Sequence, residues 1–143
     1  MNFDMKLLAY CGLYCDQCSC RAAFADQDMR HMAHMPEKYR EARPTPSDND
    51  CGGCKGRCIC PPCGIKDCAA AKGLDHCGEC ADFPCERLEA FRTDGWAHHV
   101  GAIENLRSIR ENGVETWFEA LKPTLQCHCG KRKSWYCGCP DHP

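Results

Sequence analysis

Residues 51–85 read CGGCKGRCICPPCGIKDCAAAKGLDHCGECADFPC and hold nine of the 17 cysteines in this chain of 143 residues. Two pairs in the stretch, Cys51 with Cys54 and Cys77 with Cys80, are separated by two residues that include glycine. Glycine lets a tight turn direct both thiolates of such a pair at one metal ion. The same close spacing suits structural disulfides poorly. The stretch therefore predicts a fold organised around thiolate-bound metals.

The other cysteines extend this pattern toward both ends of the chain. Four groups result: Cys11, Cys15, Cys18 and Cys20; Cys51, Cys54, Cys58, Cys60, Cys63 and Cys68; Cys77, Cys80 and Cys85; and Cys127, Cys129, Cys137 and Cys139. Four sites with four thiolates each would use all but one cysteine, so we expect at most three to four sites. We predict that all of these cysteines except Cys20, Cys58 and Cys60 are metal ligands.

Ordinary core residues are scarce. Leu, Ile, Val and Phe together number 19, about 13% of the chain, which is below the roughly 20% that marks disorder when net charge is high. The net charge is only −2, so the second condition for disorder is not met. The fold must draw stability from something other than apolar burial, and metal binding is the available source.

The N-terminal sequence does not resemble a secretory signal. In MNFDMKLLAYCGLYC, Asp4 offsets Lys6, and no small-residue cleavage site follows the short apolar run. No stretch approaches the roughly 20 apolar residues of a membrane span. We therefore expect a cytoplasmic protein, in which cysteines bind metal and do not form a disulfide scaffold.

The segments between the cysteine groups have helical character. Pro36 is expected to split residues 21–42 into two short helices, and residues 85–93 form a short helix with Leu88 and Phe91 facing inward. The strongest signal runs from Trp96 to Glu111. Its apolar residues recur at three-residue steps: Val100, Ile103, Leu106 and Ile109. A further helix is predicted over Val114–Leu121, before Pro123.

These elements predict a small, irregular, α-rich domain that is stabilised by metal. Only six residues are Val or Ile, so we expect β structure only as short knuckles around thiolate sites. The chain divides into a cysteine-rich metal-binding region (1–95), a helical hairpin (96–122) and a C-terminal segment like a zinc knuckle (123–143). We expect the three parts to form one compact domain.

The identity of the metal stays open at this level. Zinc and iron–sulfur clusters both accept four thiolates in similar arrangements, so cysteine spacing discriminates between them weakly. Cys60 directly precedes Pro61, as one cysteine does in bacterial ferredoxins, although the rest of the spacing differs. We favour Zn²⁺ for most sites and keep an iron–sulfur cluster as the alternative.

The C-terminal group resembles a compressed zinc ribbon. Basic and aromatic residues, KRKSWY (131–136), lie between Cys129 and Cys137, a combination that can bind nucleic acid. The net charge of −2, made more negative by thiolates, argues against that role. Among the histidines, His76 and His128 adjoin cysteines and are secondary candidates for metal ligands. The sequence has no phosphate-binding loop, G-x-S-x-G or H-E-x-x-H motif, so we assign no catalytic residues.

The ordered segments CGLYCDQC (11–18), CGGC (51–54) and CGIKDCAAAKGLDHCGECADFPCERL (63–88) resemble the cysteine-rich family called domain of unknown function 3795. The likeness extends over about residues 8–122. It implies a small prokaryotic metal-binding protein without an established activity. The resemblance also implies a core set of ligands: Cys11, Cys15, Cys18, Cys51, Cys54, Cys68, Cys77, Cys80 and Cys85. Cys63 is a further candidate for this set.

The leading functional hypothesis is a structural zinc protein, a small interaction module that contacts a protein partner. One alternative is an iron–sulfur protein for electron transfer or redox sensing. The other is a thiol-based metal buffer or delivery protein.

Overall fold

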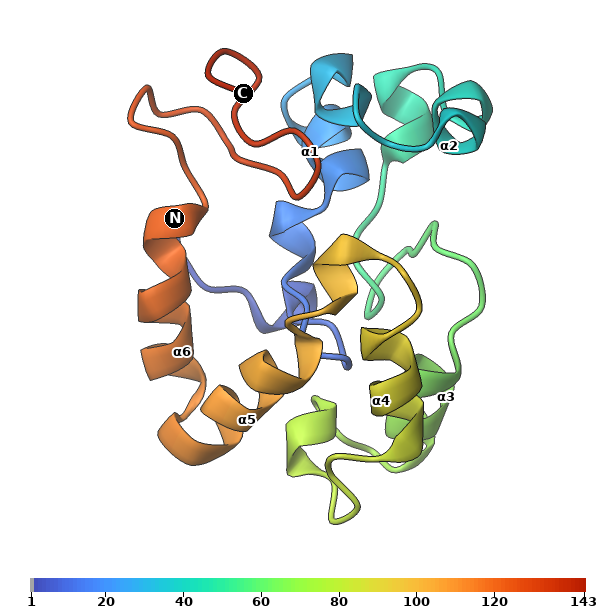
Figure 1. The fold of residues 1–143 in the computed structure, drawn as a ribbon, viewed down its shortest axis with the longest axis vertical. Helices are drawn as coiled ribbons and strands as arrows, with labels where there is room; N and C mark the ends of the chain where they lie inside the picture. The colour runs from blue at the N-terminus through green and yellow to red at the C-terminus, as the bar shows by residue number, and fades with distance from the viewer. Residues whose placement is uncertain (1) are drawn as a thin grey trace.

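A computed structural model describes residues 2–143 as a helix-rich molecule. Its helices are α1 (Ser19–Ala25), α2 (Glu37–Ala42), α3 (Gly64–Ala71), α4 (Glu86–Arg92), α5 (Ala102–Asn112) and α6 (Val114–Leu121). Short 3-10 helices join them, labelled η1 to η7: Met5–Leu7, Cys15–Gln17, Met29–Met32, Pro46–Asn49, Cys77–Glu79, Ala97–His99 and Lys122–Thr124. In Figure 1, α5 and α6 run along one side, α3 and α4 lie together on the other, and α1 and α2 occupy one end. The predicted α-rich character is confirmed.

Two consecutive helices, α5 and α6, lie within the segment 96–122, and the first of them starts later than the sequence pattern predicts. Gly113 adopts a φ of 87° and its N–H donates to the carbonyl of Ile109 at 2.9 Å, which ends α5 and turns the chain into α6. Val100 belongs to the apolar series of the predicted helix, but it lies outside α5. It lies in the turn before α5 and is 59% exposed, because the helical periodicity begins only at Ala102.

The helices before α5 agree with the sequence pattern except at α3. Pro36 separates two helical segments as predicted, with α1 before it and α2 directly after it. Leu88 on α4 is buried, and Phe91 is half-buried against the same core. The Ala-rich segment that follows Cys63 forms α3, a helix that the sequence pattern had not predicted.

Two apolar clusters compensate in part for the small number of core residues. The first gathers Ile65, Leu88, Ile103 and Leu106 from three helices, and several cysteines of the first three groups pack against it. The second joins residues of the N-terminal segment to α6, with Tyr14 in contact with the rings of Trp117 and Phe118. The cysteines therefore surround a small core and do not form a separate layer.

Gly12 marks the closest approach between the N-terminal CGLYC segment and α5. Its φ is 91°, and a Cβ at this position would lie 2.7 Å from Cγ of Leu106 and 2.8 Å from the carbonyl oxygen of Ala102. Asn105 donates from Nδ2 to the Gly12 carbonyl at 3.0 Å. Only glycine fits this backbone geometry without a shift of the helix.

The C-terminal segment folds as irregular turns that dock on α1. Trp135 N–H donates to the Gln17 carbonyl at 2.9 Å, and Tyr136 N–H donates to Oγ of Ser19 at 3.1 Å. The expected β knuckles do not appear as strands anywhere in residues 2–143. In their place are four isolated antiparallel bridges: Leu8 with Tyr14, Gln126 with Arg132, Ser134 with Gly138 and Cys139 with His142. Each turn around the cysteines is too short to extend its pairing into a ladder.

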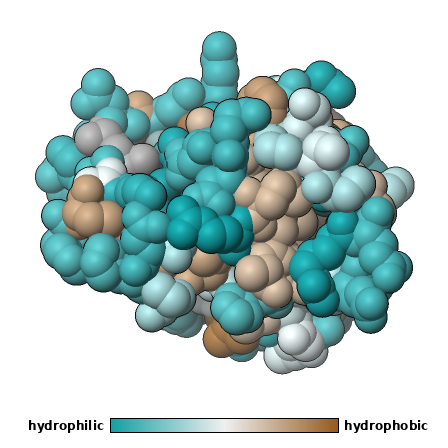
Figure 2. All heavy atoms as spheres, turned by 90° about the horizontal axis from the view of Figure 1, so that it is seen from above, coloured by the Kyte–Doolittle hydropathy of each residue, from teal (hydrophilic) through white to brown (hydrophobic). Residues whose placement is uncertain are grey.

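The surface is predominantly hydrophilic on the face seen in Figure 2, which also shows a central hydrophobic patch and smaller hydrophobic areas elsewhere. Val100 is the large hydrophobic side chain that is clearly exposed among the described residues. None of the helices described for this chain combines the length and apolar character that crossing a membrane requires.

Candidate metal centres

The C-terminal segment brings four candidate ligands together. The ligand atoms of Cys127, Cys129, Cys139 and His142 all lie within 4.8 Å of one another. The Sγ atoms of Cys129 and Cys139 are 3.6 Å apart, and Nδ1 of His142 lies 3.6 Å from Sγ of Cys127. Tetrahedral zinc with bonds of about 2.3 Å to sulfur separates its ligand atoms by about 4 Å. The arrangement therefore fits a single four-coordinate ion.

Backbone turns place these four ligands. The N–H of Cys127 donates to the Lys131 carbonyl at 2.8 Å, and the N–H of Gly130 donates to the Cys127 carbonyl at 2.9 Å, with Gly130 at a φ of 87°. On the other side, the N–H of His142 donates to the Cys139 carbonyl at 3.1 Å. Two tight turns thus face one another and supply two ligands each.

Charged contacts anchor the second turn to the rest of the molecule. Asp141, between Cys139 and His142, accepts from Nη1 of Arg30 at 2.8 Å and also contacts the ammonium group of Lys131. Arg30 belongs to η3 and also binds Asp28 at 2.7 Å. These contacts hold the His142 end of the site against the α1–η3 region.

Local hydrogen bonds favour the thiolate form at two of the three candidate cysteine ligands, Cys127 and Cys139. At Cys129 the backbone N–H of Lys131 acts to lower the pKa, but burial and the hydrogen bonds with Cys139 and Cys127 outweigh it and raise the pKa. The backbone N–H of Cys129 is the main cause of the lowered pKa of Cys127. At Cys139, burial acts to raise the pKa, but hydrogen bonds led by that from His142 outweigh it, so the pKa is lowered. A thiol with a lowered pKa gives up its proton to a metal at less cost.

The ligand set differs from the one expected from the sequence. His142 takes part, while Cys137 lies outside the group of four. His128 is adjacent, with its Nδ1 3.4 Å from Sγ of Cys127, but it is not one of the four. The spacing C-x-x-H from Cys139 to His142 is the signal that could have identified this histidine.

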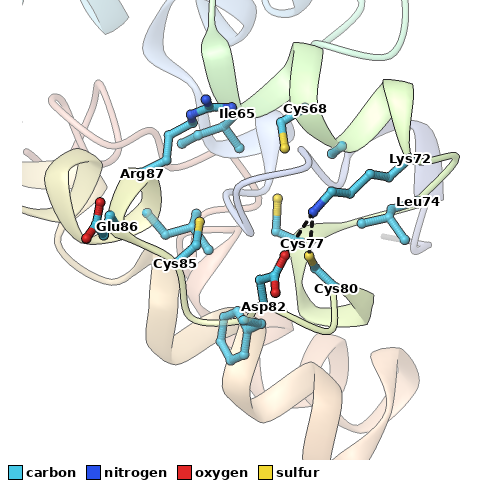
Figure 3. Close-up of a pocket in the computed structure, with 13 residues that line it drawn as sticks. Ile65, Cys68, Lys72, Leu74, Cys77, Cys80, Asp82, Cys85, Glu86 and Arg87 are labelled. Atoms are coloured by element: carbon cyan, nitrogen blue, oxygen red, sulfur yellow. Dashed lines mark hydrogen bonds and ion pairs between the residues drawn. The ribbon is translucent and has the colours of Figure 1, made fainter.

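A second constellation lines a cavity of about 590 Å³ between α3 and α4. Its cysteines come from four places: Cys68 from α3, Cys77 from η5, Cys80 from the end of that turn, and Cys85 from the N-cap of α4. Figure 3 shows the sulfurs of Cys68 and Cys77 pointing toward one another, with Lys72 reaching down to Cys80. Lys72 Nζ lies 3.3 Å from both Sγ of Cys80 and Oδ2 of Asp82.

The thiols of this cavity influence one another. Burial is the main cause that raises the pKa of Cys77 to about 12, and the nearby Cys85, Cys80 and Cys68 contribute to the same shift. The pKa of Cys80 is lowered, mainly by the backbone N–H of Asp82 and then by Lys72. The cavity therefore disfavours several bare thiolates together and would favour a cationic group between them.

A third group of cysteines lies where the N-terminal segment meets the CGGC turn. The CGGC turn packs on the N-terminal segment, since a Cβ on Gly53 would lie 3.5 Å from Sγ of Cys15. Burial raises the pKa of Cys15 to about 12, with Cys54 as the next cause. Burial also raises the pKa of Cys11, and Cys15, Cys54 and Cys63 add to it. These cysteines are neighbours, although no three of their sulfurs in the described chain lie within 4.8 Å of one another.

The remaining cysteines are more dispersed. Cys18 and Cys20 adjoin one another, and the Cys18 hydrogen bond, followed by the charge of Arg43, lowers the pKa of Cys20 to about 6. Cys51 is buried and accepts from the N–H of Gly53 at 3.4 Å. Cys58 is half-buried and Cys60 is exposed. All 17 cysteines of residues 2–143 are free of disulfide bonds.

One buried polar network was not found from the sequence. His31 is fully buried; its Nε2 lies 3.0 Å from Oδ2 of Asp26, and its Nδ1 lies 2.9 Å from Oγ of Ser134. A carboxylate only accepts, so Nε2 donates to Asp26, and Nδ1 pairs with the Ser134 hydroxyl. Because Ser134 is itself buried, this chain ties the C-terminal segment to α1 and is not an open nucleophilic site.

His76, the other candidate, is buried outside both ligand sets. Its Nδ1 has no hydrogen-bond partner within the described structure. Burial lowers its pKa, which keeps the ring neutral. It packs closely on Gly78, where a Cβ would lie 2.8 Å from Nδ1.

A family model described as "Protein of unknown function (DUF3795)" matches residues 7–90. The matched segment contains every cysteine from Cys11 to Cys85 and ends before the C-terminal group. No curated protein and no solved structure matches the chain. The four cysteines of the α3–α4 cavity therefore lie within the family segment, whereas the Cys–His group lies outside it.

Proposed function

This chain belongs to the DUF3795 family, and from that premise we propose that it is a metal-binding protein in which Cys127, Cys129, Cys139 and His142 hold a structural zinc ion. The single observation that carries the proposal is the placement of four ligand atoms within 4.8 Å of one another. Three thiolates and one imidazole are a common donor set for closed structural zinc sites.

The ion would close the two turns of the C-terminal segment on one another. That segment contributes Trp135, whose ring stacks on His98 with centroids 4.5 Å apart, and Ser134, which completes the buried network with His31. Zinc at this site would therefore hold the tail against α1 and η6. In this function the metal stabilises the fold, and exposed side chains of the helices and loops contact a protein partner.

Serine substitutions at neighbouring cysteines test the zinc site directly. We expect Cys139→Ser to lose one equivalent of zinc relative to the wild type, as measured by elemental analysis and native mass spectrometry. Cys137→Ser is the matched control, because Cys137 lies two residues away but outside the ligand set. His142→Ala should bind zinc more weakly than the control. Full zinc content in Cys139→Ser, or equal loss in Cys137→Ser, would show that these four residues do not form the site.

A further inference from the structure

The cavity between α3 and α4 is built differently from the C-terminal site. Within the described residues, no three of its four cysteine sulfurs lie inside 4.8 Å of one another, whereas all four ligands of the C-terminal set do. One zinc ion needs sulfurs about 4 Å apart. A cubane iron–sulfur cluster binds each thiolate to a different iron and so spreads the sulfurs more widely. Four cysteines that line one cavity without a compact trio of sulfurs suit a polynuclear cluster better than a single ion.

The size of the cavity also favours a polynuclear cluster over a single ion. Its volume is about 590 Å³. A water molecule in the liquid occupies about 30 Å³, and a single bare ion needs less than that. Sulfurs placed around such a space, as Figure 3 shows, leave room for a group of several iron and sulfide atoms.

The walls supply the surroundings that such clusters need. Ile65, Leu74, Phe83 and Leu88 give part of the cavity an apolar lining, and the apolar shell of a metal site is one of the features that tune a cluster. Lys72 donates to Sγ of Cys80 at 3.3 Å. An iron–sulfur cluster with four thiolates carries net negative charge, so the ammonium group stabilises it. Hydrogen bonds to cluster sulfurs are also an established means of tuning a cluster's potential.

The framework of the cavity is held by contacts that do not use the sulfurs. Arg87 on α4 donates from Nη1 to the carbonyl of Gly64, the first residue of α3, at 2.9 Å. Arg110 on α5 donates from Nη1 to the carbonyls of Gly78 and Cys80 at 3.1 and 3.0 Å, and so fixes the turn that carries Cys77 and Cys80. The four thiols are therefore presented from fixed elements, and their separation is a property of the fold.

We propose that Cys68, Cys77, Cys80 and Cys85 bind a four-iron, four-sulfur cluster in this cavity, with Lys72 as a positioning residue beside the Cys80 thiolate. Each thiol releases its proton as its sulfur binds one iron. The proposal goes beyond the zinc function and uses none of its ligands.

The first test compares metal content in full-length protein purified without oxygen. We expect iron and acid-labile sulfide in equal amounts, with visible charge-transfer absorption. Cys77→Ser/Cys80→Ser should lose one cluster's content of both, while Cys60→Ser, at an exposed cysteine outside the cavity, should retain it. Zinc bound at the C-terminal site in all three proteins reports that each variant is folded and tests the zinc proposal separately. Zinc retained without iron in the wild type, or unchanged iron in the double variant, would overturn the cluster proposal.

A second test keeps all four ligands and so does not depend on whether a cysteine variant folds. Lys72→Met removes a positive charge and a hydrogen bond from the cluster, which disfavours the more negative reduced state. We expect the midpoint potential, measured by dye-mediated titration with electron paramagnetic resonance, to fall. Lys66→Met on α3 is the control, since Lys66 does not line the cavity. An equal potential in the two variants would overturn the assignment to this cavity.

Discussion

Gly12 shows how strongly one residue can constrain the arrangement of the cysteines. It lies between Cys11 and the LYC sequence that ends at Cys15, and it touches the backbone of α5 at Ala102. The loop that carries two candidate ligands can approach the core only because this position has no side chain. A ligand site in this chain thus depends on residues that cannot bind metal.

Gly12→Ala is expected to destabilise the metal-loaded protein by more than the cost of its positive φ alone. Strained backbone costs about 1–3 kcal/mol, and a contact at 2.7 Å with Leu106 adds to it. Gly73→Ala is the matched control: its φ is 69°, but a Cβ there would meet nothing within 4 Å. In chemical denaturation, the Gly12 variant should unfold at a clearly lower denaturant midpoint than the Gly73 variant. Equal midpoints would contradict the close contact with α5.

At the scale of elements, no helix in the described chain is long enough to be stable by itself. The longest, α5, has 11 residues, and isolated helices shorter than about 12–15 residues are marginal in water. Stability must come from contacts between elements, such as the one between η6 and the C-terminal segment. There, Nδ1 of His98 lies 2.7 Å from the hydroxyl of Tyr136, and the His98 ring stacks on Trp135.

This contact should weaken in acid. Burial, together with the nearby His99, lowers the pKa of His98 from 6.5 to about 4. Between these values the unfolded chain binds the proton and the folded chain does not, so stability is full above pH 6.5 and falls as the pH drops toward 4. A shift of this size amounts to at most about 3 kcal/mol.

We expect His98→Gln to flatten the dependence of unfolding free energy on pH between 6.5 and 4. His34→Gln, at an exposed histidine, is the control and should keep the wild-type slope. Any loss of metal in acid is common to both variants, so the difference between their slopes reports the contribution of His98. Identical slopes would contradict a neutral, buried His98.

At the scale of the whole molecule, small apolar clusters pack the described segments together, and groups of cysteines lie around them. The two larger clusters contain eight and seven buried residues. The second of them joins the N-terminal segment to α6, and thiols surround the first. Metal bound by those thiols would link segments that few apolar contacts connect.

Complete removal of metal is therefore expected to unfold the protein. Treatment with excess chelator under reducing conditions should abolish most far-ultraviolet helical signal and the cooperative thermal transition, because binding energy at the metals replaces a larger core. Chelator already saturated with Zn²⁺ serves as the control and should leave both intact. A helical, cooperatively melting protein after chelation would show that the apolar clusters suffice.

The local sequence pattern predicted a helix correctly where a single helix face and its flanking residues determined the bounds. Val114–Leu121 was predicted with the bounds of α6, since its limits are set by Gly113 and by the chain ahead of Pro123. The predicted helix start at Trp96, which would have included Val100, was wrong, because a periodic pattern does not reveal where the first helical turn begins. The helix α3 was overlooked because its sequence is short and lies among cysteines that suggested only ligation.

The candidate metal sites also combine features that the sequence predicts with features that only the tertiary structure decides. Cysteine number and spacing by themselves determined the prediction that the chain binds metal through ligands in short turns. Only the tertiary structure decided that His142 joins Cys139 and that Cys68, Cys77, Cys80 and Cys85 share one cavity. The reason is physical: neighbours in sequence are set by local turns, whereas ligands around one metal are brought together by packing between distant segments.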